Sequence, residues 1–251
     1  MSEPIVRFVG IGKTYDGVTR VVEDLDLDIE RGEFLTLLGP SGSGKTTTLM
    51  MLAGFESPTA GEILLDGQPV TRLAAHRRVR AGIVRTHQIV RPFANLTVFE
   101  NVVVAAMHAH GGVAGHARDR AADVLELVGL ADRYDQPPGS LTLAARKRLE
   151  LARALATGPR VLLLDEVVAG VNPAEALAFA QLIRRVRDGR GVSVVMTEHV
   201  MPAVMSLSDR IIVLEHGKRI AEGAPRDVVS DPRVIAAYLG SEAPAAGEAV
   251  P

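Results

Sequence analysis

A glycine-rich run at residues 39–46, GPSGSGKT, constrains the fold of this chain more than any other feature. It fits the pattern GxxxxGK[ST], follows the apolar run Phe34–Leu38, and precedes a segment of helical composition at residues 47–53. A strand, a glycine-rich turn and a helix in this order predict a loop whose backbone N–H groups surround a phosphate at the positive end of the helix. We expect Lys45 to reach the β- and γ-phosphates of a nucleotide, and the hydroxyl of Thr46 to bind Mg²⁺. The residues of this stretch expected to bind the nucleotide are Gly39, Pro40, Ser41, Gly42, Ser43, Gly44, Lys45, Thr46 and Thr47.

Length and composition limit what such a loop can belong to. The 251 residues fit one large α/β domain with a subdomain, or two small domains. With 28 basic and 30 acidic residues, nothing indicates broad attraction to nucleic acid, and the lack of cysteine excludes disulfide and thiol chemistry. The amino terminus lacks the basic start of a signal peptide, and no apolar run approaches the ~18 residues of a membrane span. We therefore expect a soluble chain.

The first part of the chain predicts strands. Residues 5–11 and 21–29 alternate apolar and polar side chains, which is typical of antiparallel strands with one solvated face. Residues 61–70 predict a hairpin closed by an Asp-Gly turn. The turn at residues 13–17 carries Tyr15, whose ring could stack on a purine base or simply pack. A basic connector at residues 72–80 is predicted to be helical; basic helix faces are usually solvated, so no function is inferred from it.

The middle of the chain predicts a helical block. A short strand at residues 82–88 runs into a loop, and helices are expected at residues 98–109, 118–128 and 142–155. Gly129 is a typical helix terminus. The block, about residues 95–155, is interpreted as an insertion into the α/β domain.

The second half returns to α/β order. Residues 161–164 are wholly apolar, as in a parallel strand buried on both faces, and are followed by Asp165 and Glu166. Ligands bind open α/β sheets at the carboxyl ends of strands, so Asp165 would hold Mg²⁺ through water and Glu166 would polarise the attacking water. His199 follows the strand expected at residues 192–197 and could donate to a γ-phosphate oxygen. By themselves, a strand-end Asp-Glu turn and a lone histidine are more often structural.

Taken together, residues 5–240 resemble the nucleotide-binding subunit of an ATP-binding cassette (ABC) transporter. The resemblance implies a P-loop NTPase (RecA-like) α/β core with an antiparallel β subdomain and an inserted α-helical subdomain. It also implies that Tyr15 stacks on adenine, that residues 39–46 are the Walker A loop, and that residues 169–172 are the D-loop. The implied catalytic residues are Glu166, the switch histidine His199, the Q-loop glutamine Gln88 and Lys45, and the implied metal-binding residues are Thr46, Gln88 and Asp165. The expected division is residues 1–94 for the first part of the core, 95–155 for the helical subdomain, 156–240 for the second part of the core, and 241–251 for a disordered tail.

Three segments resemble a narrower group, the branched-chain amino acid importer ATPases. They are residues 84–102, 148–155 and 231–240. The loop and its flanks, residues 39–63, fit polyamine or sugar importer ATPases equally well, although those usually carry an extra carboxy-terminal regulatory domain.

One departure from the family concerns its signature, LSGGQ or in this branch L-x-Y-G-x-Q. The corresponding residues 141–146 are LTLAAR, so Thr142 keeps a hydroxyl, Ala144 replaces the central glycine, and Arg146 replaces the glutamine. The methyl group of Ala144 restricts positive φ and close backbone approach to a phosphate. In the family, the signature of one subunit closes over the ATP bound by the other. We therefore predict normal ATP binding, and hydrolysis when a partner supplies an intact signature. The alternative is that Arg146 itself contacts the γ-phosphate.

The resemblance implies an ATPase that acts with Mg²⁺ at the cytoplasmic face of the membrane. Its expected partners are transmembrane permease subunits, a second cassette in a homo- or heterodimer and, indirectly, a periplasmic or extracellular substrate-binding protein. Branched-chain or other amino acids and amides are the expected cargo. The alternatives are another importer, a lipid or exporter complex, and an ATP-binding regulatory subunit with weak turnover. A soluble P-loop kinase has no use for a Q-loop, a switch histidine and a helical insert in this order.

Overall fold

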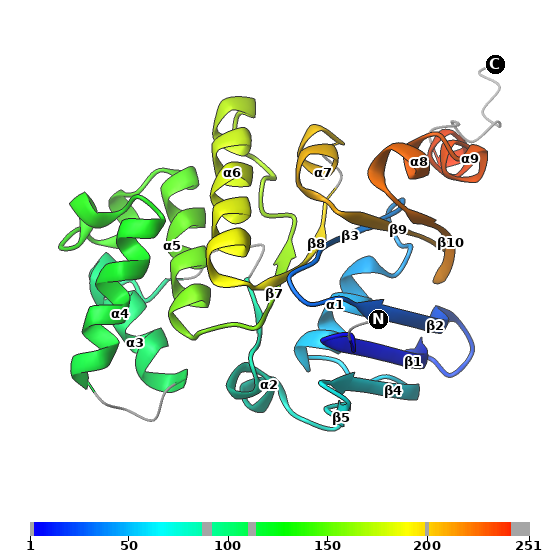
Figure 1. Ribbon diagram of the computed structural model, residues 1–251, viewed down its shortest axis with the longest axis horizontal. Coiled ribbons are helices and arrows are strands. Elements are labelled where there is room, and N and C mark those ends of the chain that lie inside the picture. Colours follow the sequence, from blue (N-terminus) through cyan, green and yellow to red (C-terminus); the bar gives the residue numbers. More distant parts are fainter. Residues whose placement is uncertain (1–2, 87–91, 110–113, 199–200, 242–251) are drawn as a thin grey trace, which may run out of the picture.

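The computed structural model describes residues 3–86, 92–109, 114–198 and 201–241 (Figure 1). Gln88 and His199 lie outside these residues, as does most of the predicted tail. The strands are β1 (Val6–Thr14), β2 (Arg20–Ile29), β3 (Phe34–Leu38), β4 (Ala60–Leu65), β5 (Gln68–Pro69), β6 (Ile83–Arg85), β7 (Val161–Asp165), β8 (Ser193–Thr197), β9 (Arg210–Glu215) and β10 (Lys218–Gly223). The α-helices are α1 (Lys45–Ala53), α2 (Ala75–Ala81), α3 (Val98–Ala109), α4 (Ala114–Leu127), α5 (Leu143–Ala156), α6 (Pro173–Arg190), α7 (Met201–Leu207), α8 (Pro225–Val229) and α9 (Pro232–Ser241).

The described strands form two sheets. Four make an antiparallel sheet in the order β2-β1-β4-β5, and six make the central sheet in the order β10-β9-β3-β8-β7-β6. All neighbours in the central sheet are parallel except β9 and β10. The predicted hairpin is confirmed, since Leu65 pairs with Gln68 and the turn residues Asp66 and Gly67 have φ of 48° and 71°, as a two-residue type I′ turn requires. The mixed α/β architecture agrees with the predicted fold class.

The central sheet separates two hydrophobic cores. Successive residues of a strand point to opposite faces, so Val161 and Leu163 of β7 pack with α1 and the antiparallel sheet, whereas Leu162 and Leu164 pack with helices on the other face. Because both faces are covered, β3, β7 and β8 are buried throughout. This is why the sequence of each is an almost unbroken apolar run.

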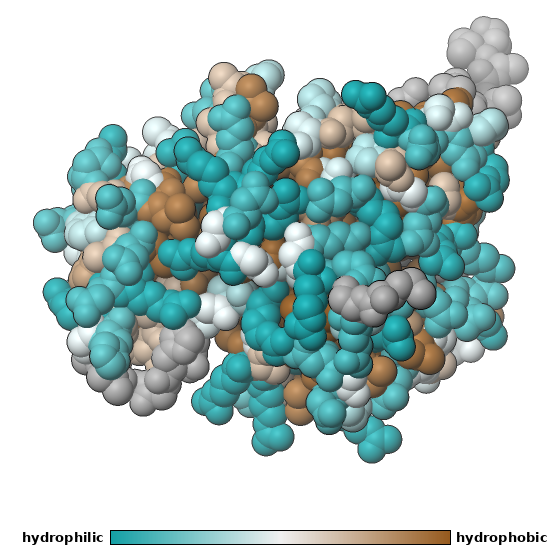
Figure 2. Space-filling model, viewed as in Figure 1, coloured by the Kyte–Doolittle hydropathy of each residue, from teal (hydrophilic) through white to brown (hydrophobic). Residues whose placement is uncertain are grey.

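Helices α3, α4 and α5 pack against one another at one end of the molecule (Figure 1). The predicted range of α3, 98–109, is confirmed. Helix α4 starts at Ala114, four residues earlier than the predicted residue 118. None of the helices in the described segments combines the length and the apolar run that a membrane crossing needs. On the face drawn in Figure 2, hydrophilic residues predominate and apolar patches are scattered.

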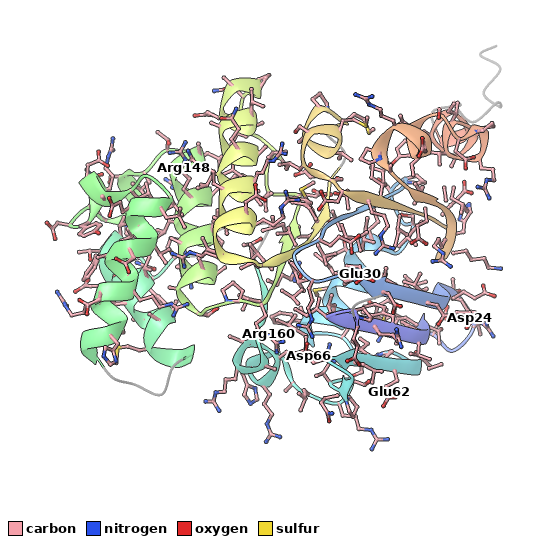
Figure 3. All side chains as sticks on the ribbon, viewed as in Figure 1. Asp24, Glu30, Glu62, Asp66, Arg148 and Arg160 are labelled. Atoms are coloured by element: carbon pink, nitrogen blue, oxygen red, sulfur yellow. The ribbon has the colours of Figure 1, made fainter. Side chains whose placement is uncertain are left out.

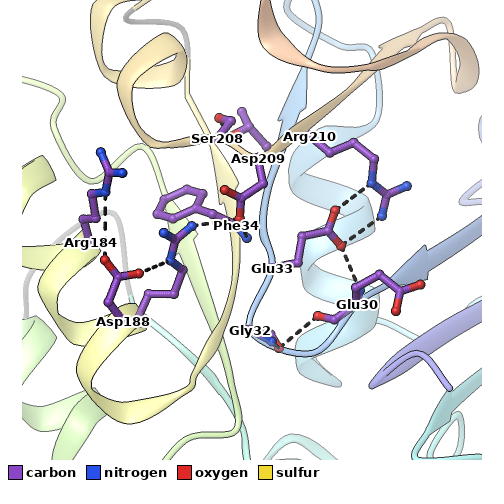
Figure 4. Close-up of polar contacts among 12 residues, drawn as sticks. Glu30, Gly32, Glu33, Phe34, Arg184, Asp188, Ser208, Asp209 and Arg210 are labelled. Carbon is purple, nitrogen blue, oxygen red and sulfur yellow. Dashed lines mark hydrogen bonds and ion pairs between the residues drawn. The ribbon is translucent and has the colours of Figure 1, made fainter. Parts of the chain in front are cut away.

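Polar contacts join the beginnings of neighbouring strands and link the two sheets. At the start of β3, the backbone N–H of Phe34 donates to Asp209 (2.8 Å), and Arg210 pairs with Glu33 (2.6 Å), which ties β3 to β9 (Figure 4). At the hairpin turn, the Asp66 carboxylate pairs with both Arg31 and Arg160. Figure 3 labels Asp66 and Arg160, which lie close to each other. The antiparallel sheet is thereby tied to the residue that precedes β7.

The basic connector contains helix α2, and one of its arginines is not solvated: Arg78 is completely buried. Its guanidinium donates to the carbonyl oxygens of Met51, Leu52 (2.8 Å), Thr71 (2.9 Å) and Leu73 (3.1 Å). Two of these carbonyls belong to the last turn of α1, whose acceptors have no partner within the helix. Burial lowers the pKa of Arg78 to about 10, so the side chain remains charged at neutral pH. Arg78 therefore caps the carboxyl end of α1 by donating hydrogen bonds to its last carbonyl oxygens.

Candidate functional site: a phosphate loop beside two carboxylates

The phosphate loop connects β3 to α1 and depends on its glycines. Gly39, Gly42 and Gly44 have φ of 147°, 77° and 98°, which side chains rarely adopt. A Cβ on Gly39 would lie 2.1 Å from the Leu214 carbonyl oxygen, and one on Gly44 would lie 2.6 Å from that of Val21. Gly44 is the N-cap of α1 and supplies no side-chain acceptor, and the first turn of α1 has no acidic residue. The N–H groups at the start of α1 are therefore left for an external anion.

Lys45, the first residue of α1, is folded back over the loop. Its ammonium donates to the carbonyl oxygens of Gly39 (2.7 Å) and Pro40 (2.8 Å) and to Ser43 Oγ (3.2 Å). Burial lowers the pKa of Lys45, and the charges of Glu166 and Asp165 oppose that shift. The ammonium therefore lies in the field of both predicted carboxylates. The adjacent Thr46 is exposed and Thr47 is half-buried. Neither residue is buried in the core, so both remain accessible to a ligand.

Asp165 and Glu166 lie at the carboxyl end of β7, as predicted. The Asp165 side chain is only 3% exposed, and both its oxygens are engaged: Oδ1 accepts from Thr197 Oγ1 (2.6 Å) and Oδ2 accepts from Arg85 Nη2 (2.6 Å). Glu166 has a φ of 47°, uncommon for a residue with a side chain, and its N–H donates to the Thr197 carbonyl oxygen (3.0 Å). Strained backbone of this kind is concentrated at functional sites.

A cavity of about 620 Å³ joins part of the phosphate loop to Glu166. It is lined by Gly39, Pro40, Ser41, Lys45, Glu166, Glu198 and Tyr238. Glu198 is buried, and its Oε1 accepts from the N–H of Val168 (2.9 Å). Tyr238, on α9, accepts a hydrogen bond from the N–H of Gly39 at its hydroxyl (2.8 Å). Sequence reasoning missed both residues. Glu198 precedes the predicted histidine, but the contact of Tyr238 spans 199 positions and leaves no local pattern.

The other predicted residues lie elsewhere. Tyr15, between β1 and β2, is 61% exposed and does not line the cavity, and the Lys13 ammonium lies 4.7 Å from its ring centroid. Thr142, Ala144 and Arg146 are at the start of α5, where Thr142 and Ala144 line a separate hollow of about 260 Å³. Of the predicted nucleotide and metal residues in the described segments, the cavity is therefore lined by Gly39, Pro40, Ser41, Lys45 and Glu166. Asp165 precedes Glu166 at the end of β7, and Tyr15 and the signature lie outside this cavity.

The start of α5 bears on the two interpretations of the altered signature. Thr142 is the N-cap, and its Oγ1 accepts from the N–H of Ala145 (3.2 Å). Arg146 donates to the carbonyl oxygens of Leu141 and Gly139, both at 3.0 Å. Ala144 has helical backbone, so a requirement for positive φ does not arise here, and only the expected hindrance to close approach remains. In this conformation the Arg146 guanidinium is engaged by its own loop.

The loop, the strand-end carboxylates and the parallel sheet define a P-loop nucleoside-triphosphatase. Comparison with known proteins narrows this class. Residues 22–169 match the family model "ABC transporter", and residues 218–244 match "Branched-chain amino acid ATP-binding cassette transporter". The chain belongs to the ABC transporter family and is one of its ATP-binding cassette ATPases.

Two relatives and one solved structure illustrate the similarity. The chain is 38% identical to the high-affinity branched-chain amino acid transport ATP-binding protein BraF of Pseudomonas aeruginosa, over 96% of this chain and 99% of that protein. The chain is 36% identical to the high-affinity branched-chain amino acid transport ATP-binding protein LivG of Escherichia coli, over 96% of this chain and 99% of that protein. The crystal structure of the ADP conformation of an ABC transporter cassette is 26% identical and superposes with a TM-score of 0.86, covering 95% of this chain and 100% of the other. The resemblance inferred from the sequence is therefore confirmed.

Proposed function

We propose that this chain powers an importer of branched-chain amino acids, or of related amino acids and amides, by binding and hydrolysing ATP. The observation that carries the proposal is the placement of Lys45 and Glu166 on one cavity beside Asp165, in a chain similar over almost its whole length to BraF and LivG. The match of residues 218–244 to a branched-chain-specific model favours this cargo over the polyamine or sugar alternative. A lipid or exporter complex gains no support from these relatives.

The residues of the site have the following proposed roles. Lys45 and the loop N–H groups bind the β- and γ-phosphates, Glu166 polarises the attacking water, and Tyr15 stacks on adenine. Thr46 and Asp165 supply the hydroxyl and carboxylate oxygens that a small hard cation prefers, so the donor set fits Mg²⁺. Bound Mg²⁺ would neutralise charge on the phosphates. Gln88 and His199, outside the described residues, are proposed to contact the metal and water and the γ-phosphate, respectively.

The assembly proposed for the chain follows from the separate roles of its core and its helical subdomain. Residues 1–94 and 156–240 form the ATP-binding core, and residues 95–155 form the helical subdomain that meets a permease at the cytoplasmic face of the membrane. Two cassettes would close head to tail, so that the start of α5 in one covers the ATP of the other. A substrate-binding protein would deliver the cargo to the permease from the opposite side.

MgATP turnover by the purified chain, with ATP-dependent dimerisation followed in parallel, tests this proposal. We expect ATP binding, and turnover that Glu166→Gln reduces by about 100-fold or more, since loss of a general base typically costs that much. A chain that does not bind ATP would contradict the proposal. Binding with negligible turnover would support the second candidate, a cassette with weak intrinsic activity, which Ala144 and Arg146 favour. Restoring Ala144→Gly with Arg146→Gln should then raise turnover in the homodimer.

A further inference from the structure

Arg85 and Asp165 form a buried ion pair at the proposed Mg²⁺ site. Arg85 ends β6, which pairs in parallel with β7, and its side chain is 11% exposed against 3% for Asp165. The 2.6 Å contact uses Asp165 Oδ2, while Oδ1 is taken by Thr197. A carboxylate buried to this extent needs a compensating charge. Of the described residues, Arg85 is the one that forms an ion pair with it.

The remaining contacts of Arg85 are weak compared with those of Arg78. Arg78 gives its hydrogen bonds to four carbonyl oxygens. Among the described residues, the one further acceptor of Arg85 besides Asp165 is the thioether sulfur of Met50 (2.8 Å), and the buried Nε has no hydrogen-bond partner there. Thioether sulfur is a weak acceptor. Asp165 is therefore the main hydrogen-bond partner of the Arg85 guanidinium, whereas the Arg78 guanidinium is held by four backbone carbonyl oxygens.

A cation bound at Asp165 and the Arg85 guanidinium would lie within a few ångströms of each other. Their like charges repel strongly in a buried, poorly solvated site. The ring of Phe55, 51% exposed, offers Arg85 an alternative, because the guanidinium carbon already lies 5.9 Å from the ring centroid, within the range of a cation–π contact. Rotation toward Phe55 and solvent would leave Oδ2 free to hold the metal through its bound water.

We propose that Arg85 is a resident counter-cation of the metal site: it neutralises Asp165 while Mg²⁺ is absent and is displaced from it when Mg²⁺ arrives with the nucleotide. The inference rests on the proposed function of Asp165. It also links metal loading to the end of β6, three residues before Gln88 in the sequence. Arg85 acts here as a positioning residue, through Asp165, and touches neither nucleotide nor reacting atoms.

The test measures how much Mg²⁺ strengthens nucleotide binding. The dissociation constant of a fluorescent ADP analogue is determined with excess Mg²⁺ and with EDTA, and the ratio of the two is the Mg²⁺ enhancement. For Arg85→Met and Arg85→Gln, which remove the charge, we expect the enhancement to rise by roughly tenfold, because a repelling charge is gone. Arg85→Lys, which keeps a charge, should stay near the wild-type value. Without Mg²⁺, the neutral variants should also melt at a lower temperature than the wild type, and Mg²⁺ with ADP should recover much of the loss.

Two controls separate this role from a purely structural one. Arg187→Met removes another largely buried arginine, whose guanidinium lies 2.8 Å from the Asp209 carboxylate. Arg187 does not line the cavity, so this variant should leave the Mg²⁺ enhancement unchanged. In an Asp165→Asn background, the effect of Arg85→Gln should vanish. An enhancement that is unchanged or smaller in both neutral Arg85 variants would overturn the proposal. Failure of the wild-type chain to bind the analogue in either condition would instead contradict the proposed function.

Discussion

Two helix starts, those of α1 and α5, are built in opposite ways. At α1 the N-cap is Gly44, which has no side chain to accept a hydrogen bond, and the first turn carries no acid. At α5 the N-cap is Thr142, whose hydroxyl accepts from the N–H of Ala145, and Arg146 closes the preceding loop by donating to two of its carbonyl oxygens. Both starts carry the positive end of a helix dipole. Only α1 leaves its first N–H groups without a side-chain acceptor.

The contrast shows how a chain distinguishes a helix start that stabilises the fold from one that binds a ligand. A side-chain cap stabilises a helix by about 1 kcal/mol. Helix α1 lacks this stabilisation because its N-cap is Gly44, and its first N–H groups remain available to bind an anion. The start of α5 keeps its cap, so a phosphate from a partner cassette would have to compete with the Thr142 hydroxyl for the same N–H. We infer that ATP binding begins at α1, and that α5 joins only when two cassettes close.

The largest expected effect comes from filling the glycine position at the start of α1. Gly44→Ala places a Cβ 2.6 Å from the Val21 carbonyl oxygen at a φ of 98°, and should reduce the free energy of unfolding by about 3 kcal/mol through overlap and backbone strain. Gly42→Ala is the matched control, because its φ is 77° but no atom lies within 4 Å of the added Cβ. It should lose only about 1 kcal/mol. Urea denaturation measures both, and equal losses would show that contact with β2 does not set the shape of the loop.

A second prediction separates ligand binding from stability at the same helix start. Lys45→Met keeps the length of the side chain and removes the charge, so ATP affinity should fall by about 100-fold, or ~2.7 kcal/mol. The free energy of unfolding should change by less than about 1 kcal/mol, because the lost hydrogen bonds to the loop are offset by relief from burying an ammonium. Calorimetric titration and urea denaturation give the two numbers. A large loss of stability with unchanged affinity would make Lys45 a structural residue.

The sequence alone predicted those elements whose structure is determined by residues close together in the chain. The strand Phe34–Leu38, the helix Val98–Ala109 and the Asp66-Gly67 hairpin all follow from periodicity or turn chemistry, and the structure has them where predicted. The position of Asp165 and Glu166 followed from a fully apolar strand. These features require only that neighbouring residues agree with one another.

Long side chains that reach across the fold could not be predicted in this way. Arg78 lies in a run of basic residues that resembles a solvated helix, yet its guanidinium reaches carbonyl oxygens 26 and 27 residues earlier. The pair between Arg85 and Asp165 joins residues 80 positions apart, and Tyr238 reaches Gly39 from α9. Each contact depends on which strands become neighbours in the central sheet or on where a late helix docks. A single sequence encodes neither in a local pattern.

The smallest expected effect is at the start of α5, and it sharpens the comparison with α1. Thr142→Ala removes the acceptor of the Ala145 N–H, and should reduce the free energy of unfolding by about 1 kcal/mol. Thr142→Ser, which keeps the hydroxyl, is the control and should remain within a few tenths of the wild type. ATP affinity of the isolated chain should not change in either variant, because α5 contributes nothing to the cavity around Lys45. If Thr142→Ala weakens ATP binding by the monomer, α5 acts on the nucleotide of its own chain, and the difference drawn between the two helix starts is wrong.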